Sequence, residues 1–380
     1  MIHLAVPNLT GNEKKYLDNC IDTTFVSSVG EYVNRFEQMV ALATGADHAV
    51  ATSSGTTGLH AALTAVGVKH DDLVIIPTFT FIASANSVRH CGADPWVMDV
   101  GEDWCLDPDF VSNEIKNNCE KRKEGLFHIP SGKRVAALMP VYTLGNIPDM
   151  EGFRAVADEY GLPLVADSAC AIGATFKDRP IAGLADLSVL SFNGNKTITC
   201  GGGGAVVGND EGLLEHVRHL TTTARVWPGY DFDEVGFNYR MTNIQAAVGC
   251  AQMERLNSFV ETKRRIRRYY ESSFRGLLGR AIDTFPTSCG SSCWFSGIVL
   301  PEGTTLTETG RICEALGKNG IEARSFWKPV HLQTPYLNIP KSRVERSEEL
   351  WQRIITLPCS TGITDDELDS VIRSVRSLFE

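Results

Sequence analysis

Short apolar runs alternate with helical patterns through the first 240 residues of the chain. Many of the runs are rich in Val, Ile and Leu and lack a strict alternation of apolar and polar residues, which indicates strands buried on both faces. Strands are expected at HAVATSS (48–54), DLVIIPTF (72–79), DPWVMDV (94–100), RVAALMPVYT (134–143), LPLVADSA (162–169), DLSVLSFN (186–193) and GGAVVGND (203–210). Helices are expected between them, for example over 55–67, 80–92 and 150–161. This order predicts an α/β fold with a mostly parallel sheet between helices.

The pattern changes after residue 240. A long helix is expected from Met241 to about Phe274, followed by a strand in SCWFSGIVLP (292–301) and a helix and strand over 306–326. The chain closes with an amphipathic helix that begins at Thr364, where Glu367 completes a capping box. We therefore expect two domains, a large one over residues 1–240 and, over residues 241–380, the long connecting helix with a smaller α+β domain.

Charge and cysteine content narrow the class of protein. The formal net charge of −10 argues against a nucleic-acid partner. The basic run KRRIRR (263–268) lies in the long predicted helix and is interpreted as a solvated face. The eleven cysteines form no C-x-x-C pair, so a reduced cytoplasmic protein without a zinc site is expected. Neither a signal peptide nor an apolar stretch long enough to span a membrane is found.

Lys196 is the first candidate for chemistry. It follows a predicted strand and precedes four consecutive glycines, Gly201 to Gly204, which could let a planar ligand approach the backbone. A flexible turn and a surface lysine are the simpler interpretation of the same residues. The similarity of GNKT to a phosphate-binding P-loop fails, because Asn195 separates the glycine from the lysine.

Other strand ends carry polar or aromatic residues that complement the lysine. Asp167 ends a hydrophobic strand, where its carboxylate needs a partner such as a helix N-terminus, an arginine or a protonated heteroaromatic nitrogen. Residues 54–57 (SGTT) begin a helix and could bind an anion, although they could equally be a simple cap. Phe79 and Phe81 lie near another strand end, as core residues or as a stack for a ring. Together these are the groups that pyridoxal 5′-phosphate (PLP) requires.

The series FVSSVGEYVNRFE, SSGTTGLHAAL, PTFTFIASANSV, VADSA, SFNGNK and GFNYRMTNIQAAVGCAQMERL resembles the DegT/DnrJ/EryC1/StrS family of sugar aminotransferases. The segment FWKPVHLQTPY extends the resemblance to nearly the whole chain. It implies the aspartate aminotransferase-like fold (fold type I), a homodimer, and transfer of an amino group from an amino acid, most simply glutamate, to a nucleotide-linked keto sugar. SFNGNK is similar to the members that act at C4 of UDP-linked 4-keto-6-deoxy-N-acetylhexosamines in bacillosamine and legionaminic acid biosynthesis.

The resemblance also assigns roles to individual residues. Lys196 would hold PLP as a Schiff base, and Asp167 would pair with the ring nitrogen. The remaining assignments are phosphate contacts from Gly55, Thr56 and Ser191, a ring contact from Phe81, a contact to the phosphate of the neighbouring subunit from Asn238, and sugar-nucleotide contacts from Arg324 and His331. Cys170 departs from the family, which usually has Gln, His or Glu there to hold the ring hydroxyl.

Two other functions fit parts of the sequence. The dehydratase branch of the same family removes a sugar hydroxyl with the same cofactor, but it has histidine in place of the lysine. A non-catalytic binding protein of the same fold is the second alternative, although it would have little reason to keep Lys196, Asp167 and Ser191.

Overall fold

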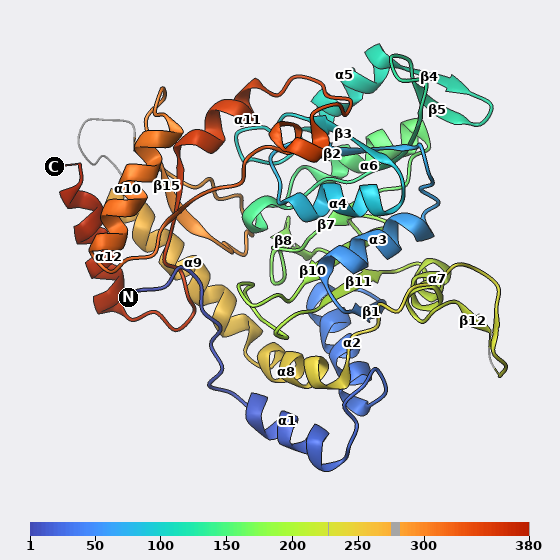
Figure 1. Ribbon diagram of the computed structural model, residues 1–380, viewed down its shortest axis with the longest axis horizontal. Helices are drawn as coiled ribbons and strands as arrows, with labels where there is room; N and C mark the ends of the chain where they lie inside the picture. Colours follow the sequence, from blue (N-terminus) through green and yellow to red (C-terminus); the bar gives the residue numbers. More distant parts are fainter. Residues whose placement is uncertain (227, 275–281, 380) are drawn as a thin grey trace.

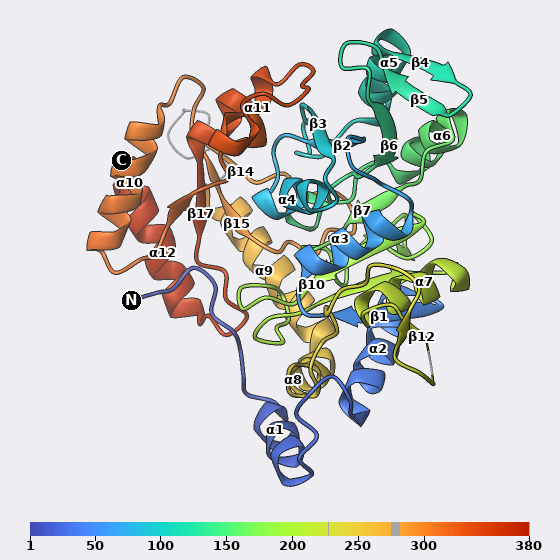
Figure 2. The ribbon, with the colours of Figure 1, turned by 45° about the vertical axis from the view of Figure 1, so that its right-hand side comes forward.

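A computed structural model describes residues 1–226, 228–274 and 282–379 of the chain. Its larger part is a twisted sheet with helices on both faces. Its smaller part, at the left of Figures 1 and 2, is a second sheet flanked by helices. The expected α/β architecture is therefore present.

The large sheet runs in the order β3-β2-β6-β7-β10-β11-β1. β7 joins β6 through the parallel bridges Leu138–Leu164 and Val141–Asp167, and in this row β11 runs against the other strands, which are mutually parallel. The strands are β1 (His48–Thr52), β2 (Leu73–Pro77), β3 (Asp94–Met98), β6 (Arg134–Leu138), β7 (Val165–Asp167), β10 (Leu187–Ser191) and β11 (Gly204–Gly208). A hairpin of β4 (Cys119–Arg122) and β5 (Gly125–His128) extends β6.

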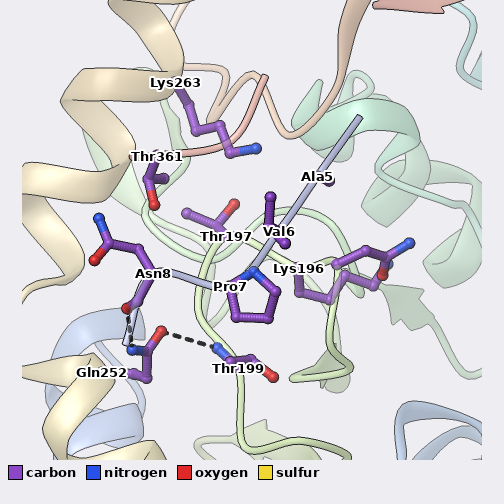
Figure 3. A pocket seen from close by; sticks show the side chains of 11 residues that line it. Ala5, Val6, Pro7, Asn8, Lys196, Thr197, Thr199, Gln252, Lys263 and Thr361 are labelled. Carbon is purple, nitrogen blue, oxygen red and sulfur yellow. Dashed lines mark hydrogen bonds between the residues drawn. The ribbon is translucent and has the colours of Figure 1, made fainter. Parts of the chain in front are cut away.

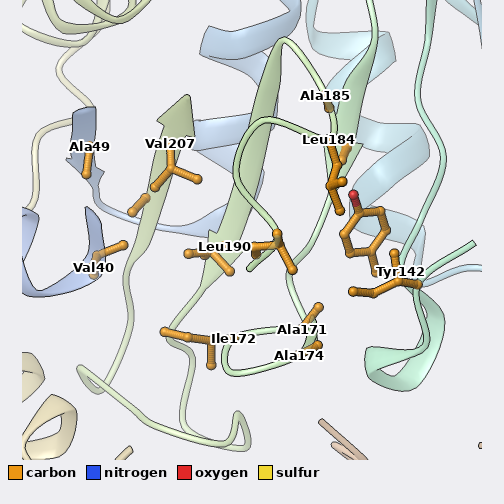
Figure 4. Close-up of a cluster of buried hydrophobic side chains, with 14 of the residues drawn as sticks. Val40, Ala49, Tyr142, Ala171, Ile172, Ala174, Leu184, Ala185, Leu190 and Val207 are labelled. Atoms are coloured by element: carbon orange, nitrogen blue, oxygen red, sulfur yellow. The ribbon is translucent and has the colours of Figure 1, made fainter. Parts of the chain in front are cut away.

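Successive side chains of each strand point to opposite faces of the sheet. In this sheet the side chains on both faces are apolar. Leu73 and Ile75 of β2 belong to one hydrophobic cluster, and Val74 and Ile76 belong to another. Figure 4 shows part of the first cluster, where Leu190 and Val207 lie near Val40 of α2. Burial on both faces explains why the strands read as continuous apolar runs in the sequence.

The helices of the large part connect the strands and cover the two faces. They are α1 (Glu13–Asp22), α2 (Glu31–Thr44), α3 (Gly55–Ala65), α4 (Ile82–His90), α5 (Pro108–Asn118), α6 (Met150–Tyr160), α7 (Glu211–Thr221) and α8 (Asn243–Met253). Two small hairpins, β8 (Thr175–Phe176) with β9 (Arg179–Pro180) and β12 (Arg225–Val226) with β13 (Asp231–Phe232), lie outside the main sheet. A 3₁₀ turn, η1 (Thr143–Gly145), follows β6.

The smaller part has an antiparallel sheet in the order β14-β15-β17-β16. Its elements are α9 (Leu256–Phe274), β14 (Asp283–Thr284), β15 (Ser296–Val299), α10 (Leu306–Lys318), β16 (Arg324–Ser325), α11 (Glu345–Leu350), β17 (Ile354–Leu357) and α12 (Asp365–Ser377), with the 3₁₀ turn η5 (Trp351–Arg353). Two further 3₁₀ turns, η3 (Val330–Leu332) and η4 (Thr334–Tyr336), pack against the large part through Val330 and Tyr336. The capping box expected at Thr364 and Glu367 is present at the start of α12.

The long helix expected from Met241 is wrong in one respect, because the chain forms two helices, α8 and α9, that run in different directions (Figure 1). Cys250 and Met253 of α8 pack into the core of the large part, whereas Ile266 and Tyr270 of α9 pack into that of the smaller part. The first turns of α9, with Phe259 and Val260, still pack into the core of the large part, so α9 itself bridges the two cores. The domain division at residue 240 stays a prediction.

The interpretation of the basic run as a solvated face is also wrong for two of its five charged residues. Arg265 and Arg268 are exposed, but Lys263 and Arg267 are buried. The Lys263 ammonium donates to the Cys359 carbonyl oxygen at 2.6 Å, and Arg267 donates to carbonyl oxygens that include that of Phe285 at 3.1 Å. Burial lowers the pKa of the Arg267 guanidinium. Net charge and sequence spacing do not reveal such buried cations, since their partners are backbone oxygens distant in the sequence.

Candidate active site

The carboxyl ends of the parallel strands surround a cavity of about 510 Å³ between the two parts of the chain. This is where ligands bind in open α/β sheets. Of the residues singled out from the sequence, eight line it: Gly55, Thr56, Phe81, Asp167, Cys170, Ser191, Lys196 and Arg324. Residues more than a hundred positions apart are thus brought together by the order of the strands.

Lys196 lies on a turn that follows β10. The turn is closed by the Lys196 N–H, which donates to the Asn193 carbonyl oxygen at 3.0 Å. Its returning limb is held from below by Gln252 of α8, whose amide oxygen accepts from the Thr199 N–H at 3.3 Å and whose amide nitrogen donates to the Asn8 carbonyl oxygen at 2.9 Å (Figure 3). The turn that carries Lys196 is therefore fixed to α8 by hydrogen bonds.

The amine of Lys196 has two close contacts inside the cavity. Its Nζ lies 3.3 Å from the Sγ of Cys170 and 3.7 Å from the ring centroid of Trp294. Burial raises the pKa of the Cys170 thiol, so the thiol is neutral at physiological pH. No ion pair joins Lys196 to a carboxylate within the described residues, which leaves the amine free to bind another group.

Asp167 is buried at the end of β7, with 4 % of its surface exposed. Its Oδ2 accepts from the Ser84 hydroxyl at 2.6 Å and its Oδ1 from the Ala169 N–H at 3.1 Å. Burial raises the pKa of the Asp167 carboxyl, and the Ser84 and Ala169 donors and the charge of Lys196 oppose this shift. Over the described ranges, Asp167 has no ion pair, so a buried carboxylate faces the cavity without a cationic partner.

The start of α3 provides an anion cradle at the same strand ends. Ser54 and Thr57 form a capping box, which uses the Thr57 hydroxyl in hydrogen bonds. The hydroxyls of Thr56 and Ser191, in contrast, have no hydrogen-bond partner in the described part of the chain. These hydroxyls and the helix N-terminus suit a phosphate. A Cβ on Gly55 would come within 2.9 Å of the Ser191 side chain, so glycine keeps the cradle open.

At least one glycine of the run after Lys196 is required by a close contact between two backbone segments. A Cβ on Gly204 would lie 2.5 Å from the Ser54 carbonyl carbon, so glycine allows β11 to pass directly beside the start of α3. Gly202 and Gly203 do line the cavity. Of the four glycines, Gly202 and Gly203 are therefore the ones that could admit a planar ligand, as expected from the sequence.

The other residues singled out from the sequence lie at the edge of the cavity or outside it. Phe81 is 55 % exposed at its edge, with its ring centroid 6.1 Å from that of Trp327. Asn238 is exposed and pairs through its backbone with Thr222, outside the cavity lining. His331 is also outside: it is buried, with Nδ1 2.6 Å from the Thr78 hydroxyl and Nε2 2.8 Å from the Glu348 carboxylate.

Three residues of the cavity were missed in the sequence. Ser84 lies in the first turn of α4, three residues after Phe81, and its hydroxyl orients Asp167. Trp294 and Trp327 come from the smaller part, more than ninety residues after Lys196. A serine early in a helix after a strand end could have suggested the first, but no local signal places the two tryptophans. Among the described residues, no group of three or more metal-ligating side chains could hold a metal ion, and no helix is long and apolar enough to cross a membrane.

Comparison with known proteins identifies the class. The model of the DegT/DnrJ/EryC1/StrS aminotransferase family matches residues 7–376. The chain is 36 % identical to GDP-perosamine synthase of Caulobacter vibrioides, over 98 % of this chain and 97 % of that one. It is 32 % identical to the putative pyridoxal phosphate-dependent aminotransferase EpsN of Bacillus subtilis, over 100 % and 96 % of the two chains.

The fold agrees with solved members. The structure of S. venezuelae DesV in complex with a ketimine intermediate superposes with a TM-score of 0.85 and 28 % identity, over 97 % of this chain and 94 % of that one. The fold is that of the fold-type I aminotransferases. The chain belongs to the DegT/DnrJ/EryC1/StrS aminotransferase family, and it is a PLP-dependent sugar aminotransferase.

Asp167 is a buried carboxylate that forms no ion pair within the described residues. We therefore expect that removing its charge changes the stability of the cofactor-free protein. Because burial raises the folded-state pKa of Asp167, the native state carries a disfavoured charge at neutral pH. We expect Asp167→Asn to stabilise the cofactor-free protein at neutral pH, on the order of 1 kcal/mol or more in the free energy of unfolding.

The difference in stability between the wild type and Asp167→Asn should depend on pH. As pH falls through the raised pKa of Asp167, the wild-type carboxyl takes up a proton, and the difference between the two proteins shrinks until it is lost below the ordinary value of 3.8. Urea unfolding of both proteins across this range measures it, with Asp18→Asn on exposed α1 as control. A destabilised Asp167→Asn variant at neutral pH would show that the carboxylate is already compensated within the chain.

Proposed function

We propose that this aminotransferase uses Lys196 and Asp167 to transfer an amino group from glutamate to the C4 ketone of a nucleotide-linked 4-keto-6-deoxyhexose. The observation that carries the proposal is that one cavity holds an amine and a buried carboxylate, neither of which forms an ion pair with any of the described residues. PLP supplies the missing groups on both sides, an aldehyde for the amine and a protonated ring nitrogen for the carboxylate.

The remaining residues fit the shape of the cofactor. The free hydroxyls of Thr56 and Ser191 and the N-terminus of α3 at Gly55 would bind its phosphate. Phe81 would cover a face of its ring, and Cys170, beside Lys196, would lie near the ring hydroxyl as a weak hydrogen-bonding group.

When bound, PLP withdraws the electrons released as a proton leaves the donor's Cα. Lys196 would take that proton and return it, acting as general base and then as general acid. This requires the amine to stay in place after its release from the cofactor, which the contacts of Lys196 with Cys170 and Trp294 support. Arg324, exposed at the cavity and ion-paired with Glu322, is proposed to contact the diphosphate of the nucleotide sugar.

The relatives refine the choice of sugar. Three proteins at 32–36 % identity bear the name GDP-perosamine synthase. They favour a GDP-linked 4-keto-6-deoxyhexose. The SFNGNK motif favours the UDP-linked N-acetylated sugar of the bacillosamine type, which is the second candidate. Both carry a ketone at C4 and a methyl group at C6, so the proposed chemistry is common to the two.

A panel of substrates tests the proposal. The enzyme with PLP and glutamate is incubated with GDP-linked and UDP-linked 4-keto-6-deoxy sugars, with and without the N-acetyl group, and with a 3-keto isomer. We expect amination at C4, fastest with the GDP-linked sugar, as identified by mass and NMR. Lys196→Arg keeps the charge but should lower the rate at least about a thousandfold, because the guanidinium can neither attach the cofactor nor act as a base at neutral pH. Product from the 3-keto isomer alone would overturn the C4 assignment.

We also propose a homodimer with shared active sites, located in the cytoplasm. Asn238 is exposed outside its own cavity, as a residue directed to a neighbouring subunit must be. The eleven cysteines are all free, which suits a reducing compartment.

Complementation of two inactive variants tests the sharing of sites. Mixed dimers of Lys196→Ala and Asn238→Asp subunits should regain about a quarter to a half of the wild-type activity, because one of the two sites then has both native residues. The carboxylate of the second variant would repel a phosphate. Recovery of no activity in verified mixed dimers would place Asn238 in its own subunit's site, and an Asn238→Asp protein that is fully active by itself would place Asn238 outside any site.

A further inference from the structure

Trp294 touches both the amine of Lys196 and the turn that carries it. The indole ring centroid lies 3.7 Å from Nζ, and the indole Nε1–H donates to the carbonyl oxygen of Asn195 at 2.8 Å. Trp294 itself is 3 % exposed, so these contacts are made in a largely dry environment, where the attraction between a cation and an aromatic face is strongest.

The segment that carries Trp294 is held by the basic residues of α9. Arg267, which is 1 % exposed, donates to the carbonyl oxygen of Phe285 at 3.1 Å and to the Ser296 hydroxyl at 3.1 Å. Arg264 donates to the Ser291 carbonyl oxygen at 2.9 Å. These bonds fix the segment on both sides of Trp294, which gives Arg264 and Arg267 of the KRRIRR run a structural role that the sequence did not suggest.

The backbone around Trp294 is also fixed to the large part of the chain. The Trp294 N–H donates to the Leu144 carbonyl oxygen at 3.0 Å, and the Ser292 hydroxyl donates to the Cys170 carbonyl oxygen at 2.9 Å. The indole is therefore placed from three directions: α9, the turn after β6 and the loop after Asp167.

We propose that Trp294 is a positioning residue for Lys196: its ring holds the ε-amine at the cavity while the amine is not bound to cofactor, and its N–H fixes the peptide that precedes the lysine. The proposal rests on the proposed function, in which Lys196 is repeatedly detached from PLP and attached again. Among the described residues no carboxylate forms an ion pair with the amine, so the indole face and the Cys170 thiol are the groups that can hold it.

The test separates holding the amine from holding the cofactor. Apoenzyme of the full chain is mixed with PLP, and the rate of covalent attachment is followed by the visible absorbance at neutral pH, where the attraction between a lysine ammonium and the indole face operates. The affinity for pyridoxamine phosphate, which fills the same cradle but cannot react with an amine, is measured in parallel. Trp294→Leu removes both contacts, whereas Trp294→Phe keeps an aromatic face and loses the N–H donor.

We expect Trp294→Leu to slow attachment about tenfold with unchanged affinity for pyridoxamine phosphate, and Trp294→Phe to lie between Trp294→Leu and the wild type. In turnover, kcat should fall with little change in the KM for glutamate. Trp104→Leu is the matched control, because Trp104 is also 3 % exposed and lies in the same hydrophobic cluster, but does not line the cavity. It should attach PLP at the wild-type rate.

Two results would overturn the proposal: an unchanged rate of attachment in Trp294→Leu, or parallel losses of attachment rate and pyridoxamine phosphate affinity, which would mean that the indole is only structural support. Lys196→Ala distinguishes these failures from failure of the proposed function. If PLP still attaches covalently to that variant, another lysine carries the cofactor and the assignment of Lys196 itself is wrong.

Discussion

The site depends on a buried carboxylate that forms no ion pair with any residue that the structure describes. Asp167 ends a strand in the middle of the large sheet, and its two hydrogen bonds, from Ser84 and Ala169, orient it but do not neutralise its charge. Removing a carboxylate from water is costly unless a cation compensates it. We propose that the protonated ring nitrogen of the cofactor, lying above Asp167, compensates this charge, which would tie the fold to its chemistry.

The arrangement of the two parts follows from that requirement. The parallel strands bring the phosphate cradle, Asp167 and the turn of Lys196 to one edge of the sheet, and the smaller part closes the cavity with aromatic side chains. α8 and α9 connect the two parts: α8 and the first turns of α9 pack into the core of the large part, and the rest of α9 packs into that of the smaller part. Since Trp294 reaches the amine from the smaller part, the position of that part affects the reactive group directly.

The sequence predicts the main elements and their order because both faces of each strand are apolar and the turns carry clear signals. It also predicts Lys196 and Asp167, whose residue types are unusual at strand ends and whose motifs resemble those of a known family. It fails where the decisive contacts are distant in the sequence. The burial of Arg267 depends on carbonyl oxygens of residues 285 and 295, and the enclosure of His331 depends on Thr78 and Glu348, so neither could be read from local pattern.

The central claim is that PLP is attached to Lys196 in this cavity, and borohydride reduction tests it most directly. The PLP-loaded protein is reduced and digested, and the peptides are mapped by mass spectrometry. The account predicts one modified site per chain, at Lys196, with the label lost in Lys196→Ala. A reduced label on a different lysine, or an active enzyme in which no lysine is labelled, would contradict it.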